Sequence, residues 1–134
     1  MFILDTMVVS EGFKLRPSPT VVPWLNRTEP ASLFVSVLTF GEIEAGIEKK
    51  RRSDGAFDRL EEWLEGTRIR YEDRTLPITT SIAMRWGRLH MSLQRKDPDL
   101  LIAATALEHD LAVVTRNVRH FEPTGVKLLN PYEA

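Results

Sequence analysis

The chain has no cysteine, no long hydrophobic run and no excess of basic charge, and each absence excludes a class of function. Without cysteine there is no disulfide, no thiolate metal site and no cysteine nucleophile, a composition that fits a reducing cytoplasm. The apolar residues 2–4 stop at Asp5, far short of a signal peptide or a membrane span. A net charge of −1 excludes a protein that binds nucleic acid as a polycation over its whole surface. We therefore expect a soluble cytoplasmic protein that does not enter a membrane.

The length of 134 residues suits a single domain, residues 1–134, with a hydrophobic core of its own. Its basic residues are mostly arginine and lie in clusters, for example at residues 49–52 and 116–119. Such clusters are typical of an ordinary mixed surface, but they also fit an acidic site set among basic patches. Composition alone favours the ordinary surface, so support for an acidic site has to come from the sequence motifs.

Short apolar runs alternate with helical patterns, which predicts a parallel sheet with helices on both faces. Strands are expected at residues 2–4, 33–37, 76–78, 111–115 and 127–129. Helices are expected at residues 8–13, 39–52, 57–64, 79–96 and 97–107. Three prolines within residues 16–23 predict a loop or a poorly formed helix start, and the more credible helical turn begins at Trp24. The predicted fold class is therefore α/β, with three layers, α/β/α, around a central, mostly parallel sheet of four to five strands.

The rest of the chain is organised around residues 97–121. Asp97 is expected to cap a helix, with Pro98 in its first turn and Asp99 as a second carboxylate near the positive dipole end. Residues 100–107 carry no charge, so this helix should be buried, and the β-branched run that follows is typical of an inner strand. Asn117 comes directly after that strand. Because strand ends and helix starts line the ligand crevice of open α/β sheets, this stretch should bring two oxygen ligands to one site.

Four polar side chains stand where such a sheet would gather them: Asp5, Glu42, Asp99 and Asn117. Two carboxylates 4 Å apart repel by about 4 kcal/mol at an effective dielectric near 20, so three of them together need a cation. Oxygen ligands without histidine or cysteine suit Mg²⁺, or Mn²⁺, rather than zinc. Such an ion, with open coordination positions, is what phosphodiester hydrolysis requires.

Each of these residues also has a purely structural interpretation. Glu42 completes a capping box with Thr39, Asp99 can act as a helix-dipole acid, and Asn117 can be a turn residue. Asp5 is harder to explain this way unless a helix begins directly after it. Taken separately the four signals are weak, but their joint placement at one edge of the sheet favours a site.

Other candidate chemistry is less well supported. The histidines show no ligand spacing, and we interpret all three as surface or helix-end residues: His90, His109 and His120. Asp5 followed by a threonine also suggests a phosphatase with an aspartate nucleophile. Such sites usually place a second acid two residues on, where this chain has Met7.

Several short motifs together resemble the PIN-domain ribonucleases, most of all the VapC/FitB-like toxins of bacterial toxin–antitoxin pairs. They are residues 4–6 (LDT) with 8–11 (VVSE), 41–46 (GEIEAG), 99–106 (DLLIAATA), 114–117 (VTRN) with Phe121, and 130–132 (NPY). The resemblance spans nearly the whole chain. It implies a PIN-like α/β/α fold and a Mg²⁺-dependent endoribonuclease that is inhibited by a small antitoxin. It also implies a homodimer that meets DNA only indirectly, through the antitoxin.

The resemblance implies a role for each candidate residue. Asp5 and Asp99 would be direct metal ligands, Glu42 would complete the metal site and orient or deprotonate the attacking water, and Asn117 would occupy the fourth position of the motif. Further substrate-binding candidates for the RNA are Thr6, Arg85, Arg88 and Arg116.

Two positions depart from the family pattern. Met7 stands where the family usually has asparagine, and His120 stands where it often has an acid. Met7 removes a hydrogen bond that would orient Asp5. It therefore favours the alternative hypothesis of a catalytically weakened PIN-fold binding module that still binds its antitoxin or RNA.

Overall fold

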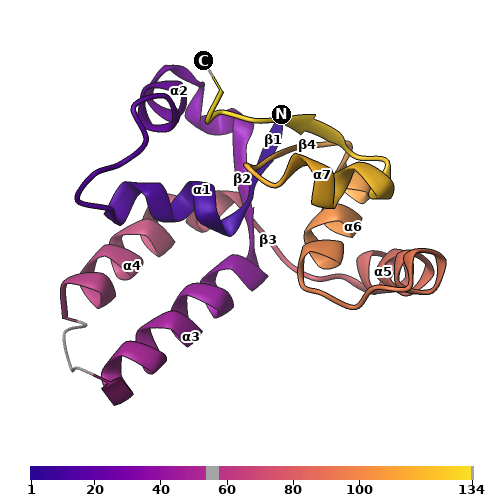
Figure 1. Ribbon diagram of the computed structural model, residues 1–134, viewed down its shortest axis with the longest axis horizontal. Coiled ribbons are helices and arrows are strands. Elements are labelled where there is room, and N and C mark those ends of the chain that lie inside the picture. Colours follow the sequence, from indigo (N-terminus) through magenta and orange to yellow (C-terminus); the bar gives the residue numbers. More distant parts are fainter. Residues whose placement is uncertain (54–57, 134) are drawn as a thin grey trace.

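A five-stranded parallel sheet forms the centre of the computed structural model, which describes residues 1–53 and 58–133 (Figure 1). The strands are β1 (Phe2–Leu4), β2 (Leu33–Ser36), β3 (Thr75–Leu76), β4 (Ala112–Val114) and β5 (Lys127–Leu129). Their order across the sheet is β3-β2-β1-β4-β5, and all the described pairings are parallel. The predicted α/β class, with a parallel sheet flanked by helices, is confirmed.

Helices cover both faces of this sheet (Figure 1). They are α1 (Thr6–Ser10), α2 (Val21–Arg27), α3 (Val37–Ser53), α4 (Asp58–Arg70), α5 (Thr80–Leu93), α6 (Asp99–His109) and α7 (Val118–Phe121). Short 3-10 segments are η1 (Glu11–Phe13), η2 (Pro30–Ser32), η3 (Glu72–Arg74) and η4 (Glu122–Thr124). None of the helices in the described ranges is both long enough and apolar enough to cross a membrane.

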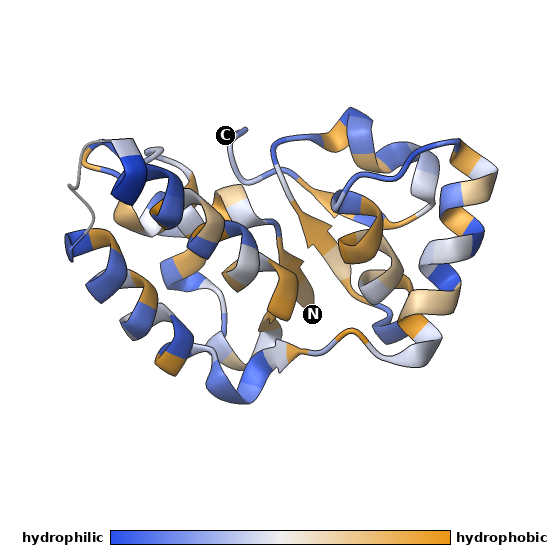
Figure 2. Ribbon diagram, turned by 90° about the horizontal axis from the view of Figure 1, so that it is seen from below, coloured by the Kyte–Doolittle hydropathy of each residue, from blue (hydrophilic) through white to orange (hydrophobic). Residues whose placement is uncertain are grey.

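The two faces of the sheet have separate cores because side chains alternate along a strand. In β1, Leu4 packs with α1 to α4, where its cluster includes Val8 and Ile47. The preceding Ile3 points to the other face and packs with α6 and α7, where its cluster includes Ile102 and Phe121. Figure 2 shows the apolar strands between helix layers whose outer surfaces are largely hydrophilic. This arrangement fixes which side of the sheet each helix start faces.

The topology places a crevice beside the end of β1. From β1 the chain adds β2 and β3 on one side, and it then returns to add β4 and β5 on the other side. Helices on opposite sides of β1 and β4 therefore diverge beyond the carboxyl ends of these strands, which is where open α/β sheets bind ligands. The backbone amide of Asp5 donates to the carbonyl of Val114 at 2.9 Å, so the ends of the two strands are joined there.

Several helix boundaries differ from those expected, for identifiable reasons. Of the two alternatives for residues 16–23, the structure shows a helix start: α2 begins at Val21, three residues before Trp24, and holds Pro23 in its first turn, where a missing backbone donor is tolerated. Helix α3 begins at Val37, a residue predicted to lie in the strand, because the Ser36 hydroxyl accepts a hydrogen bond from the backbone amide of Leu38 at 3.0 Å. Phe57, predicted at a helix start, lies outside the described residues.

Candidate active site

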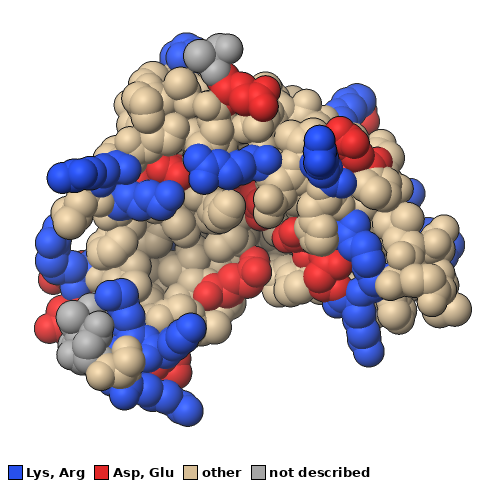
Figure 3. Space-filling view, viewed as in Figure 1, with Lys and Arg blue, Asp and Glu red and all other residues tan. Residues whose placement is uncertain are grey.

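A cavity of about 280 Å³ opens at the carboxyl ends of β1 and β4. It is lined by Asp5, Thr6, Met7, Ser10, Lys14, Glu42, Asp99 and Asn117. The structure thus brings together all four polar residues that the sequence singled out, and the substrate-binding candidate Thr6 lines the same cavity. Figure 3 shows acidic side chains around a central hollow, with lysine and arginine side chains near its rim.

Asp5 is held rigidly at the centre of this cavity. It follows β1 directly and caps α1, where its Oδ1 accepts from the Thr6 backbone amide at 2.8 Å. Its Oδ2 accepts from the Thr115 hydroxyl at 2.7 Å, and the side chain is almost fully buried. Burial raises the pKa of Asp5, while the hydrogen bonds from Thr115 and Thr6 oppose this effect. Capping is therefore part of its role, but it leaves each carboxylate oxygen with a further lone pair.

Glu42 is oriented by a threonine pair rather than by a capping box. The Thr6 hydroxyl donates to Glu42 Oε1 at 2.7 Å and lies 3.1 Å from the Thr39 hydroxyl. Thr39 is buried inside α3, past the helix start, so the capping-box interpretation is wrong. The spacing that suggested a cap instead places Thr39 and Glu42 on the side of α3 that faces α1.

Asp99 begins α6 and faces the same cavity. Burial, together with the nearby Asp5 carboxylate, raises the pKa of Asp99 to about 6. The carboxylates of Asp97 and Glu42 act in the same direction, whereas His120 acts in the opposite one. At neutral pH the Asp99 carboxylate is thus ionised against the repulsion of its neighbours, which is the electrostatic setting that favours a bound cation.

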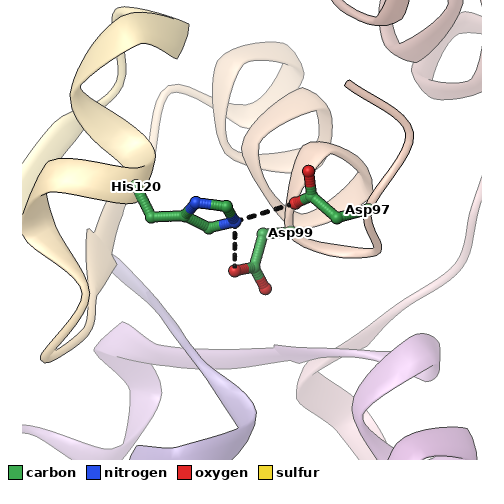
Figure 4. A group of neighbouring side chains, drawn as sticks. All are labelled: Asp97, Asp99 and His120. Carbon is green, nitrogen blue, oxygen red and sulfur yellow. Dashed lines mark hydrogen bonds and ion pairs between the residues drawn. The ribbon is translucent and has the colours of Figure 1, made fainter.

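His120 is an exposed residue near the end of α7, as predicted, and it also contacts this acidic group. Its Nε2 lies 3.0 Å from Asp97 Oδ2 and 3.3 Å from Asp99 Oδ2, as Figure 4 shows. One ligating atom from each of the three side chains lies within 4.8 Å of the others. The three side chains are close enough together to coordinate one metal ion. The acidic group therefore includes a histidine nitrogen and Asp97 in addition to the predicted oxygen ligands.

Asp97 has a different role from the one predicted. Helix α6 begins at Asp99, and the residue before it makes no side-chain capping bond, so Asp97 is not the cap. Its carboxylate binds Arg95 through both oxygens, at 2.8 and 3.0 Å, and this hydrogen bonding lowers the pKa of Asp97 to about 2. Arg95 also donates to the His120 carbonyl at 2.7 Å. Arg95 therefore joins the segment before α6 to α7 at the edge of the cavity.

The predicted substrate-binding arginines separate into two groups. Arg116 lines a second cavity that shares Asn117 with the acidic one, and its guanidinium lies 4.1 Å from the centre of the Tyr132 ring. Arg85 and Arg88 lie on α5 and line neither cavity, and Arg85 pairs with Glu108 at 2.7 Å. The structure thus brings Arg116 to the site, but not the other two. Lys14, which the sequence analysis did not single out as a site residue, lines the acidic cavity.

Comparisons with known proteins agree with this geometry. A family model described as PIN domain matches residues 2–125. The plasmid stability protein StbB of Pseudomonas syringae pv. tomato is 30% identical over 142 residues, which cover 100% of both chains. The VapC ribonuclease Y4jK of Sinorhizobium fredii is 29% identical over 143 residues, 99% of each chain.

Solved structures extend this likeness to three dimensions. The crystal structure of FitAcB from Neisseria gonorrhoeae matches with a TM-score of 0.87 and 28% identity, covering 100% of both chains. The chain therefore belongs to the PIN-domain family, and within it to the VapC/FitB-like toxins of toxin–antitoxin systems.

Proposed function

We propose that this protein is a metal-dependent endoribonuclease that hydrolyses RNA phosphodiester bonds and acts as the toxin of its toxin–antitoxin pair. One observation carries the proposal: Asp5, Glu42 and Asp99 come from three separate elements and line one cavity. Burial and the Asp5 carboxylate raise the pKa of Asp99 to about 6, as expected of acids gathered around a cation site. The name of the relative Y4jK, a VapC ribonuclease, supports the same activity.

The donor set fits a hard divalent ion. The lining offers carboxylate oxygens from Asp5, Asp99 and Glu42 and an amide oxygen from Asn117, the ligand types that suit Mg²⁺ and Mn²⁺. We assign Asp5 and Asp99 as direct ligands, completed by Glu42. Bound there, the ion would lower the pKa of a coordinated water and neutralise charge on the phosphate.

The chain's own side chains would position the reactants. Glu42, oriented by the Thr6 hydroxyl, is placed to accept a proton from the attacking water. Asp5 is held by hydrogen bonds to both oxygens, so it needs no reorganisation when the site fills. Lys14 and Arg116 at the edge of the cavity supply positive charge that attracts the RNA.

The toxin assignment implies a small antitoxin as partner. We propose that the protein acts in the cytoplasm and that the antitoxin inhibits it there by blocking the acidic cavity. Structural neighbours that are toxin–antitoxin complexes support this partner, among them a toxin–antitoxin complex from Klebsiella pneumoniae at 26% identity. We also propose that the chain forms a homodimer and that it contacts DNA only through the antitoxin.

A second candidate is a binding module without catalysis. It is favoured by Met7, which is 39% exposed and lines the cavity where an amide would assist Asp5. Such a module would bind RNA or antitoxin, but neither Mg²⁺ nor Mn²⁺ would stabilise it.

A cleavage assay decides between the two. Purified protein should cut a single-stranded RNA with Mg²⁺ and stop when the metal is chelated. Asp5→Asn and Asp99→Asn should each lower the rate by at least about 100-fold, because each removes a ligand charge. Asp73→Asn, at a surface carboxylate outside the cavity, is the matched control. Equal cleavage by the site variants and the wild type would point to a contaminating nuclease.

A further inference from the structure

A larger cavity, of about 750 Å³, adjoins the acidic one. Its lining includes Arg116, Asn117, Arg119, Glu122, Asn130 and Glu133. Asn117 lines both cavities, so whatever occupies the larger one lies directly beside the carboxylates. The volume lies within the roughly 300–1,000 Å³ typical of small-molecule sites.

Arg116 forms a supported stacking surface at this cavity. Its guanidinium lies 4.1 Å from the centre of the Tyr132 ring, and the Tyr132 hydroxyl donates to Glu11 Oε2 at 2.8 Å. Glu11 is only 1% exposed and also accepts from the Ser18 backbone amide at 2.9 Å. A buried carboxylate that the proposed cleavage does not use thus holds the tyrosine that supports Arg116.

Glu11 remains an anion although it is buried. Burial opposes ionisation, but hydrogen bonds from Lys14, the Ser18 amide and Tyr132 together lower the pKa of Glu11 below its ordinary value. An ionised carboxylate accepts hydrogen bonds but donates none, so the Tyr132 hydroxyl has to donate to it. The orientation of the Tyr132 ring, and hence of Arg116, is therefore fixed by a charge inside the protein.

The lining groups fit an RNA base better than an apolar peptide. A planar guanidinium stacks on an unpaired base. The Asn117 and Asn130 amides can hydrogen-bond a base edge, while Glu122 and Glu133 accept from base amino groups. These two carboxylates also disfavour a phosphate deep in the cavity, which leaves the phosphate for Arg119 or for the acidic site beside it.

We propose that this cavity binds one unpaired ribonucleotide of the substrate, next to the bond that is cut, with its base stacked on Arg116. The inference rests on the proposed ribonuclease function, which it extends by adding a base-recognition subsite. Tyr132 is a positioning residue in this scheme, since it acts through Arg116.

Nucleotide binding can be tested without cleavage. Metal-free protein is titrated with each of the four ribonucleoside 5′-monophosphates, and the side-chain amide signals of Asn117 and Asn130 are followed by NMR. At least one nucleotide should shift both signals, and Arg116→Ala should weaken its binding about 10-fold, because it removes the group on which the base stacks. The matched control is Arg68→Ala, at an exposed arginine of α4. No shift with any nucleotide, or equal affinity in Arg116→Ala, would overturn the proposal.

Arg116→Lys separates stacking from simple charge attraction, because lysine keeps the charge but lacks the planar group. We expect it to bind the nucleotide about as weakly as Arg116→Ala. Affinity equal to that of the wild type would show that only the charge matters, and the stacking subsite would be wrong.

Cleavage of single-stranded oligonucleotides gives an independent result. Arg116→Ala should raise KM about 10-fold, with a much smaller effect on kcat, and should reduce the base preference beside the cut. Tyr132→Phe should show a weaker form of the same change. If the wild type cuts no RNA, the proposed function fails while the NMR titration still decides the cavity. If the cavity amides respond only to a bound protein segment, the occupant is a peptide and the subsite is refuted.

Discussion

Asp97 and Asp99 lie two residues apart in opposite electrostatic settings, so the same substitution should have opposite effects on stability. Burial and the Asp5 carboxylate raise the pKa of Asp99 to about 6, against an ordinary 3.8. A hydrogen bond from Arg95 lowers the pKa of Asp97 to about 2. In the metal-free protein, Asp99→Asn should therefore stabilise the fold and Asp97→Asn should destabilise it.

The magnitudes follow from the pKa values. For Asp99 the difference between about 6 and 3.8 is about two pKa units, which at roughly 1.4 kcal/mol per unit gives an upper limit of about 3 kcal/mol gained by Asp99→Asn. For Asp97 the difference between 3.8 and about 2 is similar, but the side chain is 31% exposed, so we discount the loss to about 1–2 kcal/mol.

The pH dependence provides a second test of the sign. The folded protein has the higher pKa at Asp99, so its destabilising effect is absent below about pH 4 and complete above about pH 6. The gain from Asp99→Asn should accordingly vanish near pH 4. Asp97 has the lower pKa in the folded protein, so its contribution is present above about pH 4 and is lost only as the pH falls through about 2.

Urea unfolding in the presence of a chelator, at pH 7 and near pH 4, measures both variants. Asp73→Asn is the control, because its carboxylate is 84% exposed and contacts Arg74 at the surface. Its effect should be below about 1 kcal/mol. The electrostatic reasoning would be refuted if Asp97→Asn and Asp99→Asn both lowered the free energy of unfolding at pH 7. It would also be refuted if the stabilisation by Asp99→Asn persisted at pH 4.

Three further substitutions test other parts of the site. Thr6→Val removes the hydrogen bond to Glu42 and should lower kcat about 10-fold in a single-turnover assay; an unchanged rate would show that Glu42 needs no such support. Arg95→Ala leaves the Asp97 carboxylate without its main partner and should cost about 2 kcal/mol in urea unfolding, a result that a loss below about 0.5 kcal/mol would contradict. Met7→Asn should raise the cleavage rate several-fold by adding to the cavity an amide that can hydrogen-bond Asp5. A slower variant would show that Met7 does not weaken catalysis.

Much of the fold could be predicted because its signals are local. Short apolar runs separated by helical patterns indicate parallel strands, and all five strands occur near the expected residues. Boundaries were less predictable, since they depend on single contacts. The Ser36 hydroxyl, for example, binds the Leu38 backbone amide and so allows α3 to begin earlier than expected.

The core of the candidate site was also predictable, because topology gathers strand ends. Asp5 and Asn117 follow adjacent strands, and Asp99 begins a helix at the same edge. The roles of individual residues were harder to infer from spacing alone. Thr39 and Glu42 have the spacing of a capping box, yet in the structure they share the Thr6 hydroxyl.

The contacts around His120 could not be predicted, because they join residues far apart in the chain. Arg95 and Asp97 meet His120 only when α6 and α7 pack together, and no local pattern reports that contact. The available signal was that His120 stands where the family often has an acid. A residue at a position that is acidic in relatives is a candidate for the site even when its own type differs.

Binding of Mn²⁺ to the purified protein tests the central claim most directly, that acids from separate elements form one cation site. Metal-free protein is titrated with Mn²⁺, and the free ion is followed by electron paramagnetic resonance. We predict saturable binding to the wild type and to Asp73→Asn, with an affinity at least about 10-fold weaker in Asp99→Asn. Absence of binding to the wild type, or equal affinity in Asp99→Asn, would contradict the account.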